Sequence, residues 1–286
     1  MNDPTSPAAV TPRPQITVTG PMKAKAYADD LTARTAALEV FGCLACSFRL
    51  WRENLRPLVG VTFLILFIQS LIGAIPIVGA LSGLLLNGVY WGGLAYYYLG
   101  KMRGESREVS DAFAGFSKAL GPLVLASLFI ALLIIAVLAF ILMTYQAVLP
   151  SGASAARVVL LLGVIPLVYL AVGWTFTFPL VIDKGLSPGT AMEVSRLVVT
   201  RQWFRVFLLM ICACILGLLC VLPALGVLFT PLSGVLLKLT PILGTIFLGL
   251  LCVIPFISVL LALPLMLGAI FYAYEDLFSP PGPAVS

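Results

Sequence analysis

The sequence predicts an all-α integral membrane protein with about six transmembrane helices. They are arranged as three hairpins, each preceded by a cytoplasmic amphipathic helix in the membrane interface. Composition is the first observation that predicts this, since 61% of the 286 residues are hydrophobic and 10% are charged. Soluble domains have about 45–50% apolar and about 25% charged residues. So few charges cannot cover a water-facing surface, which excludes a soluble fold. The other two observations are the spacing of the charges and their distribution across the membrane.

Long uncharged stretches mark the predicted spans, because a charge at the bilayer centre costs about 2.5–3.5 kcal/mol. The 44 residues between Arg56 and Lys101 hold two helices of about 20 residues, and each of four later stretches holds at least one. The predicted spans are Pro57–Ile75, Val78–Leu99, Leu120–Gln146, Val158–Ile182, Val206–Phe229 and Pro241–Tyr274. The last two contain Pro223, Pro231, Pro255 and Pro264. Each of these two is a kinked helix, a helix with a re-entrant turn, or a tight hairpin.

The basic residues predict that both termini are cytoplasmic. In that orientation fifteen of the seventeen Lys and Arg residues lie inside, and only Arg157 and Lys238 lie outside. Such an excess is typical of cytoplasmic loops. Aromatic residues near the cytoplasmic ends of the spans are predicted to lie at the headgroup level. They are Trp51, Trp203, Tyr96, Tyr97, Tyr98, Tyr272 and Tyr274.

Three segments between the spans are predicted to be interfacial amphipathic helices. One begins at Ser187-Pro188, a second at Ser110-Asp111, and a third covers about Ala37–Leu55. The third has Leu38, Phe41, Leu44 and Phe48 on one side. The predicted membrane domain, residues 36–277, therefore consists of units at about 37–101, 108–183 and 187–276. Residues 1–35 and 278–286, rich in Pro, Ser, Thr and Ala, are predicted to be flexible tails.

The candidate lipid contacts are basic residues beside the spans, which suit anionic headgroups on the cytoplasmic side. They are Arg52, Arg56, Lys184, Arg196, Arg201 and Arg205. No formal charge lies inside a predicted span, which argues against proton coupling. The sequence contains no histidine, and Cys43-x-x-Cys46 stands without a second pair, so we expect no metal or cofactor and no catalytic residue.

The second predicted span carries small residues that allow close helix packing. They are Gly79, Gly83, Gly88 and Gly92, in two G-x-x-x-G motifs. These glycines either pack inside the bundle, which we favour, or meet a second copy of the chain. Asn87, near the middle of this span, either lines a substrate path or, as we favour, makes an interhelical hydrogen bond.

The stretch from Phe178 to Arg196, followed by Arg201-Gln-Trp-Phe-Arg205, resembles a pattern in a known family. It is similar to the membrane domain attached to some bacterial glycerophosphodiester phosphodiesterases and to stand-alone relatives of that domain. The resemblance covers about Trp174–Leu209 closely and 40–276 through its hydropathy plan. It implies a bacterial inner-membrane protein. Residues 1–286 contain no region that could supply the hydrolase domain, so the resemblance does not imply that activity.

These observations support three hypotheses on function. The first is a non-catalytic multi-pass protein of the bacterial cytoplasmic membrane, a scaffold, accessory subunit or lipid-organising protein. The second is a permease or lipid-handling transporter with its path near the Pro-containing fifth and sixth spans. An intramembrane lipid enzyme is the third and least favoured. The expected partners are membrane lipids and either another protein or a second copy, and no nucleic acid is expected.

Overall fold

The computed structural model of the protein describes residues 21–34, 37–228 and 241–279, and the regular elements within them are all helices. This confirms the predicted fold class. Four stretches in these ranges are long and apolar enough to cross a membrane, and two further candidates are helix pairs bent by 54° and 94°. The described part of the chain therefore holds four to six candidate spans. The candidate spans and the elements between them form the three predicted units.

The first unit contains an interfacial helix and a hairpin whose second arm is bent. Its elements are α2 (Val40–Glu53), α3 (Leu55–Gly73), α4 (Pro76–Leu85) and α5 (Asn87–Met102). The second predicted span was expected to be one helix, but α4 and α5 meet at 54° around Leu86. The bend follows from packing, because α5 is buried along most of its length whereas α4 buries no residue.

The second unit begins with the short η1 (Val109–Phe113) and α6 (Ala114–Lys118), where a helix had been predicted from Ser110. Then α7 (Leu120–Val148) and α8 (Ala153–Gly173) form a hairpin through η2 (Leu149–Ser151). At 1.5 Å per residue the 29 residues of α7 measure about 43 Å, longer than a bilayer core of about 30 Å. The fourth predicted span is also interrupted, because α8 ends at Gly173 and α9 (Thr177–Lys184) begins after a turn.

The third unit consists of α10 (Pro188–Arg201), α11 (Trp203–Leu228) and α13 (Pro241–Phe278). Within the described residues α11 and α13 are each one helix, so a re-entrant turn or an extra hairpin at these prolines was a wrong expectation, whereas a kinked helix stays a prediction. Pro223 lies within α11, and Pro255 and Pro264 lie within the 38 residues assigned to α13. Pro231 lies outside the described residues. The third unit is thus a single antiparallel hairpin.

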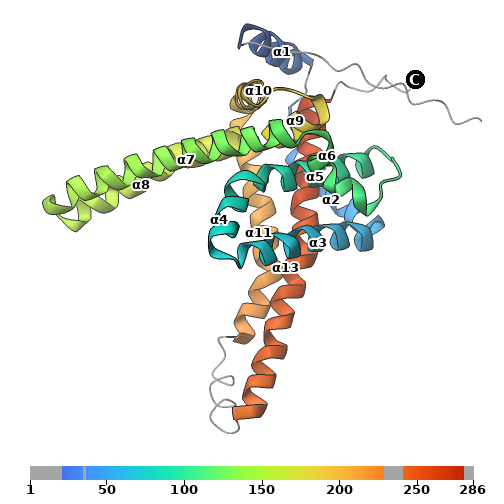
Figure 1. Ribbon diagram of the computed structural model, residues 1–286, viewed down its shortest axis with the longest axis vertical. Coiled ribbons are helices and arrows are strands. Elements are labelled where there is room, and N and C mark those ends of the chain that lie inside the picture. Colours follow the sequence, from blue (N-terminus) through green and yellow to red (C-terminus); the bar gives the residue numbers. More distant parts are fainter. Residues whose placement is uncertain (1–20, 35–36, 229–240, 280–286) are drawn as a thin grey trace, which may run out of the picture.

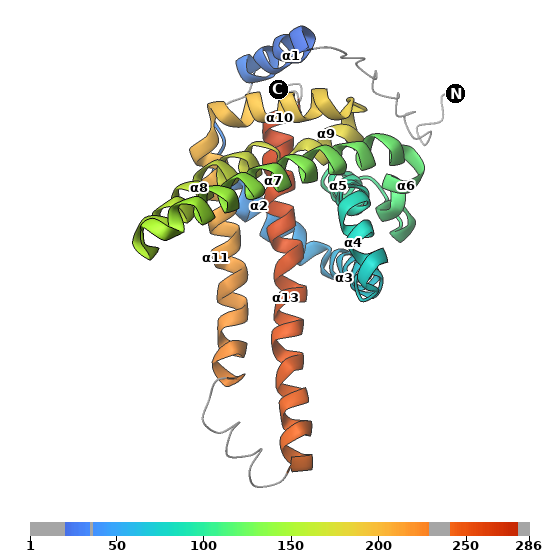
Figure 2. The ribbon, with the colours of Figure 1, turned by 60° about the vertical axis from the view of Figure 1, so that its left-hand side comes forward.

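The hairpins project from a shared region in different directions (Figure 1). Figure 2 shows α11 and α13 running side by side along the long axis, while α7 and α8 extend sideways as a second pair. The segments α1, α9 and α10 gather where the two pairs meet. The largest fully buried side chains include Tyr97, Tyr98, Tyr274, Phe176 and Phe278. The three tyrosines predicted at the headgroup level are thus buried in the protein core, and their depth in the membrane stays a prediction.

A helix also lies where a flexible tail was predicted, because residues 21–34 form α1 (Pro21–Arg34). Ala24, Ala28 and Leu31, one turn apart, are buried. Arg201 of α10 bonds to Asp29 and Thr32 of α1. Small apolar side chains at helical spacing allow α1 to pack on α10, although the composition of the segment is typical of a tail.

Candidate functional site

The largest described ion-pair cluster joins the ends of α5, α9 and α13. Arg103, directly after α5, contacts Asp183 of α9 at 2.6 Å and Glu275 of α13 at 2.6 Å. Tyr274 donates its hydroxyl to Asp183 at 2.9 Å, and Lys184 lies 3.4 Å from the same carboxylate. The Arg103, Asp183 and Glu275 side chains are 18%, 10% and 20% exposed. The cluster holds three separate helices together at one end of the molecule.

The Arg103 guanidinium is stabilised in its charged form by these partners. Burial on its own would lower the pKa of Arg103, but the hydrogen bonds and charge of Asp183, and then those of Glu275, raise it. A partly buried ion pair of this kind is costly to break, because removing one partner leaves the other charge uncompensated. The arrangement contains no open coordination position or exposed nucleophile, so we interpret it as a structural clamp.

A groove of about 670 Å³ lies between α7 and α10. Its α7 wall consists of Phe129, Leu132, Leu133 and Ala136. These positions are i, i+3, i+4 and i+7, so they share one face of the helix. Leu132 on this face is 53% exposed. The helix α7 has hydrophobic residues on all its faces. One wall of the groove is thus a continuous aliphatic and aromatic surface.

The α10 wall of the groove repeats the same spacing with different chemistry. It consists of Gly189, Met192, Glu193 and Arg196. The opposite face of α10 is buried, and Ser195 donates its hydroxyl to the Gly173 carbonyl at 2.7 Å. That bond attaches α10 to the end of α8, so the polar pair Glu193 and Arg196 is held at the rim facing the apolar α7 wall.

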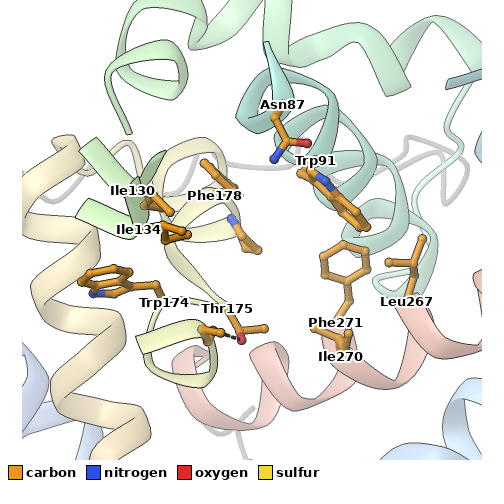
Figure 3. Close-up of a pocket in the computed structure, with 12 residues that line it drawn as sticks. Asn87, Trp91, Ile130, Ile134, Trp174, Thr175, Phe178, Leu267, Ile270 and Phe271 are labelled. Atoms are coloured by element: carbon orange, nitrogen blue, oxygen red, sulfur yellow. Dashed lines mark hydrogen bonds between the residues drawn. The ribbon is translucent and has the colours of Figure 1, made fainter. Parts of the chain in front are cut away.

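Trp174 forms the end of the groove and also borders a second cavity. It follows α8, where the chain turns before α9, and its side chain is 9% exposed. The second cavity measures about 280 Å³ and lies between α5, α7, α9 and α13 (Figure 3). Ile130 and Ile134 of α7 face this inner pocket, whereas the adjacent face of the same helix lines the groove. The structure therefore places an outer groove and an inner pocket on either side of α7 and Trp174.

The six predicted lipid-contacting residues are divided among different environments. Arg52, Arg56 and Arg205 are exposed, as a surface contact with headgroups requires. Arg196 lines the groove, whereas Arg201 is bonded to α1. Lys184 lies in the ion cluster.

The predicted packing glycines also separate into two groups. A Cβ at Gly88 would lie 2.3 Å from Ser127 Oγ, and one at Gly92 would lie 2.8 Å from Leu123 Cδ1, so both glycines pack against α7. A Cβ at Gly79 would meet the Gly73 carbonyl of α3 at 2.6 Å, and one at Gly83 would meet nothing within 4 Å.

Asn87 lies at the start of α5, not in the middle of a straight span. Its side chain makes no hydrogen bond in the described part of the chain and borders the inner pocket, so the interhelical bond stays a prediction. The neighbouring Gly88 N–H instead donates to Ser127 Oγ at 2.8 Å.

Sequence reasoning missed Arg103, Glu275 and Trp174. Arg103 and Glu275 were assigned only to the cytoplasmic side by their charge. Their pairing depends on the approach of α5, α9 and α13, which lie far apart in the sequence. Trp174 was hidden within a predicted continuous span, and the Trp-Thr-Phe-Thr run at 174–177 is the one local signal of the turn.

The chain matches no protein-family model, no curated protein and no solved structure. The geometry of the groove, the inner pocket and the ion cluster therefore carries the functional argument for this multi-pass helical membrane protein.

Proposed function

We propose that the protein is a non-catalytic, multi-pass protein of the bacterial cytoplasmic membrane that binds phospholipid in the groove between α7 and α10 and so organises lipid around it. The observation that carries this proposal is the pairing of an apolar α7 wall with a polar α10 rim. Phospholipids have the same two-part chemistry, with acyl chains joined to a charged headgroup.

The position of Arg196 supports a phosphate contact. Guanidinium groups bind phosphate through two parallel hydrogen bonds, and Arg196 has no ion pair with any described residue. Its neighbours in the groove, Met192 on α10 and Leu133 on α7, provide the apolar surface that acyl chains need. The resemblance to the phosphodiesterase-attached membrane domain, over Trp174–Leu209, includes the α10 wall of the groove. The α7 wall lies outside that stretch.

The groove favours phospholipid binding over transport along the predicted path. Its lining combines one carboxylate and one guanidinium with apolar side chains. The permease hypothesis placed a path at broken fifth and sixth spans, yet α11 and α13 are described as unbroken helices. The breaks occur instead at Leu86 and after α8, beside the inner pocket.

We also propose that both termini face the cytoplasm, as the excess of basic residues indicates. In that orientation α10 lies at the cytoplasmic headgroup level, where Arg196 meets lipid phosphate. Exposed Arg52, Arg56 and Arg205 would then contact anionic lipid headgroups less specifically. A protein partner or a second copy remains compatible with this role.

The test is native mass spectrometry of the purified full-length protein in mild detergent, with phosphatidylglycerol, phosphatidylethanolamine or diacylglycerol added. We expect saturable phospholipid adducts and fewer diacylglycerol adducts, because diacylglycerol has no phosphate. Arg196→Gln should lower phospholipid affinity about tenfold, since a hydrogen bond to a charged group contributes about 1.5–3 kcal/mol.

Arg157→Gln is the matched control, because it removes the same charge from an exposed position that lies outside the groove and is not a predicted headgroup contact. Its affinity should remain near that of the unmodified protein. Equal losses in the two variants would mean that phospholipid binds by general surface charge, and the groove proposal would be rejected.

A further inference from the structure

The inner pocket has a composition that differs from that of the groove. It lies between the two helix interruptions, with Asn87 from the start of α5 and Trp174 from the turn after α8 on its walls. Figure 3 shows the rings of Trp91, Phe178 and Phe271 around the same space. No charged side chain lines it. The pocket is therefore suited to an uncharged, largely apolar molecule.

Two of its polar side chains, Thr175 and Asn87, differ in whether they are already engaged. The Thr175 hydroxyl donates to the Ala171 carbonyl at 2.9 Å within its own turn. The Asn87 amide makes no hydrogen bond in the described part of the chain, and Figure 3 shows it beside Trp91 at the edge of the pocket. Asn87 is exposed, and its amide offers both a hydrogen-bond donor and an acceptor to a molecule that enters the pocket. Asn87 is thus an available polar anchor.

We propose that the inner pocket binds one uncharged aliphatic molecule with a single hydrogen-bonding head, of the fatty-alcohol or monoacylglycerol class. Its head would bond Asn87, and its chain would lie against Trp91, Phe178 and Phe271. The volume supports a single chain, since 280 Å³ lies just below the range of about 300–1,000 Å³ for small-molecule pockets. A whole diacyl phospholipid would need more space and would bring a charge to a wall that has none to balance it.

This site is separate from the groove and does not depend on phospholipid binding there. Ile130 and Ile134 face the inner pocket, whereas Leu132 and Leu133, between them in sequence, face the groove. Side chains on one of these two faces can therefore be changed without altering the lining of the other. Trp174 alone lines both cavities.

The experiment uses intrinsic tryptophan fluorescence of the full-length protein in detergent. Of the four tryptophans, Trp91 and Trp174 line the pocket, so Trp51→Phe and Trp203→Phe remove the other two. Linear 1-alkanols from octanol to hexadecanol are the probes. We expect a saturable change, with affinity rising about fourfold for each methylene. The rise should stop at the chain length that fills the pocket.

Partition into the detergent micelle gives a different result, because it does not saturate and shows no limit in chain length. A linear, non-saturating response to every alkanol would overturn the proposal.

Two variants test the chemistry. Asn87→Leu removes the amide at similar volume and should weaken alkanol binding about fivefold, the value of one hydrogen bond, while binding of the matching alkane is unchanged. Ile134→Trp should fill the pocket and abolish binding of both probes, measured here with radiolabelled probes because the introduced indole would itself fluoresce. Its matched control is Ile135→Trp, the next residue on α7, which is 53% exposed and lines neither cavity.

Equal alkanol affinity in Ile134→Trp and Ile135→Trp would place the probe elsewhere and overturn the site. Arg196→Gln should leave alkanol binding unchanged. The two proposals can therefore fail separately: loss of the Arg196 effect on phospholipid binding rejects the groove, and loss of the Ile134 effect on alkanol binding rejects the pocket. Gel filtration of each variant shows whether it is folded, and Asn87→Leu supplies the answer if Ile134→Trp does not fold.

Discussion

Arg103 and Asp183 form a two-point ion pair, with Nη1 2.6 Å from Oδ1 and Nη2 3.1 Å from Oδ2. Arg103 follows the last turn of α5, and Asp183 lies in the last turn of α9. The Arg103 Nε also donates to Glu275 of α13 at 2.6 Å. One guanidinium thus joins three helices that also border the inner pocket, so the stability of the pocket walls depends on this contact.

Replacing Arg103 by Met should strongly destabilise the protein, because Asp183 and Glu275 would remain as partly buried carboxylates without their shared cation. Breaking a buried pair in this way costs about 3–5 kcal/mol. Thermal unfolding in detergent, followed by circular dichroism, measures the loss. Arg52→Met, at an exposed position, should change stability by less than about 0.5 kcal/mol. A similar small effect in Arg103→Met would show that the clamp contributes little.

Gly88 of α5 and Gly83 of α4 provide a matched pair that tests how the two halves of this bent span pack. Gly88→Ala would place a Cβ 2.4 Å from Phe178 Cε1, so the side chains of α7 and α9 must move, at a cost of about 1–3 kcal/mol. Gly83→Ala meets nothing within 4 Å and should stabilise α4 by up to about 1 kcal/mol. The same unfolding assay separates them. If Gly88→Ala and Gly83→Ala changed the free energy of unfolding by the same amount, the close contact of α5 with α7 would be contradicted.

Glu193 should influence which headgroup the groove prefers. Its carboxylate shares the rim with Arg196, so an amine-bearing headgroup such as phosphatidylethanolamine can pair with both. Glu193→Gln removes the acceptor charge and should shift preference toward phosphatidylglycerol by about threefold to tenfold, the scale of an exposed ion pair. Competition between the two lipids in native mass spectrometry measures this ratio. An unchanged ratio would exclude a headgroup contact at Glu193.

Cys43 should react unusually slowly with maleimides or iodoacetamide. Burial, and then the nearby Asp276 carboxylate, raises the pKa of its thiol to about 12, from an ordinary value of 9.0. The thiolate is the nucleophile, so in a variant that retains Cys43 alone the alkylation rate should still be rising at pH 10. Asp276→Asn should lower the pH at which the rate levels off but leave it above 9, because burial of the thiol remains. A plateau near pH 9 in the parent would contradict the structure.

The same raised pKa has a consequence for stability. Because the folded state holds the Cys43 proton more tightly than the unfolded chain, this contribution is complete below about pH 9 and is lost as pH rises toward 12.

The orientation of the chain can be tested with single cysteines. Ala153→Cys, in the turn between α7 and α8, should be labelled from the periplasmic side of intact cells by a membrane-impermeant maleimide. Ser187→Cys, just before α10, should be labelled only after the cells are opened. Both positions are exposed, so a difference reflects the side of the membrane and not burial. Labelling of both from the same side would reject the predicted topology.

Local patterns predicted many of the elements. The uncharged stretch before Arg157 predicted Leu120–Gln146, and α7 covers Leu120–Val148. Ser187-Pro188 predicted that α10 begins with Ser187 at the N-cap and Pro188 as its first residue, and the structure confirms this start. Both signals act within a few residues, since Pro suits the first turn of a helix and long apolar runs have no other stable place than lipid.

Other features could not be predicted from local patterns. The prolines at 255 and 264 indicated breaks that α13 does not have, while Leu86 and the turn after Gly173 interrupt segments that carry no charge. Breaks of this kind depend on what each half packs against. Gly88 against Phe178 is one such contact, between residues 90 positions apart.

Hydropathy and charge act on each segment independently, so the amino-acid sequence was sufficient to predict a multi-pass helical membrane protein. The contacts of Arg103 with Asp183 and Glu275, the apolar wall opposite Arg196 and the pocket beside Asn87 become visible in the packed helices. Each of these relationships joins helices distant in sequence, and their approach is governed by the packing of side chains on both surfaces at once.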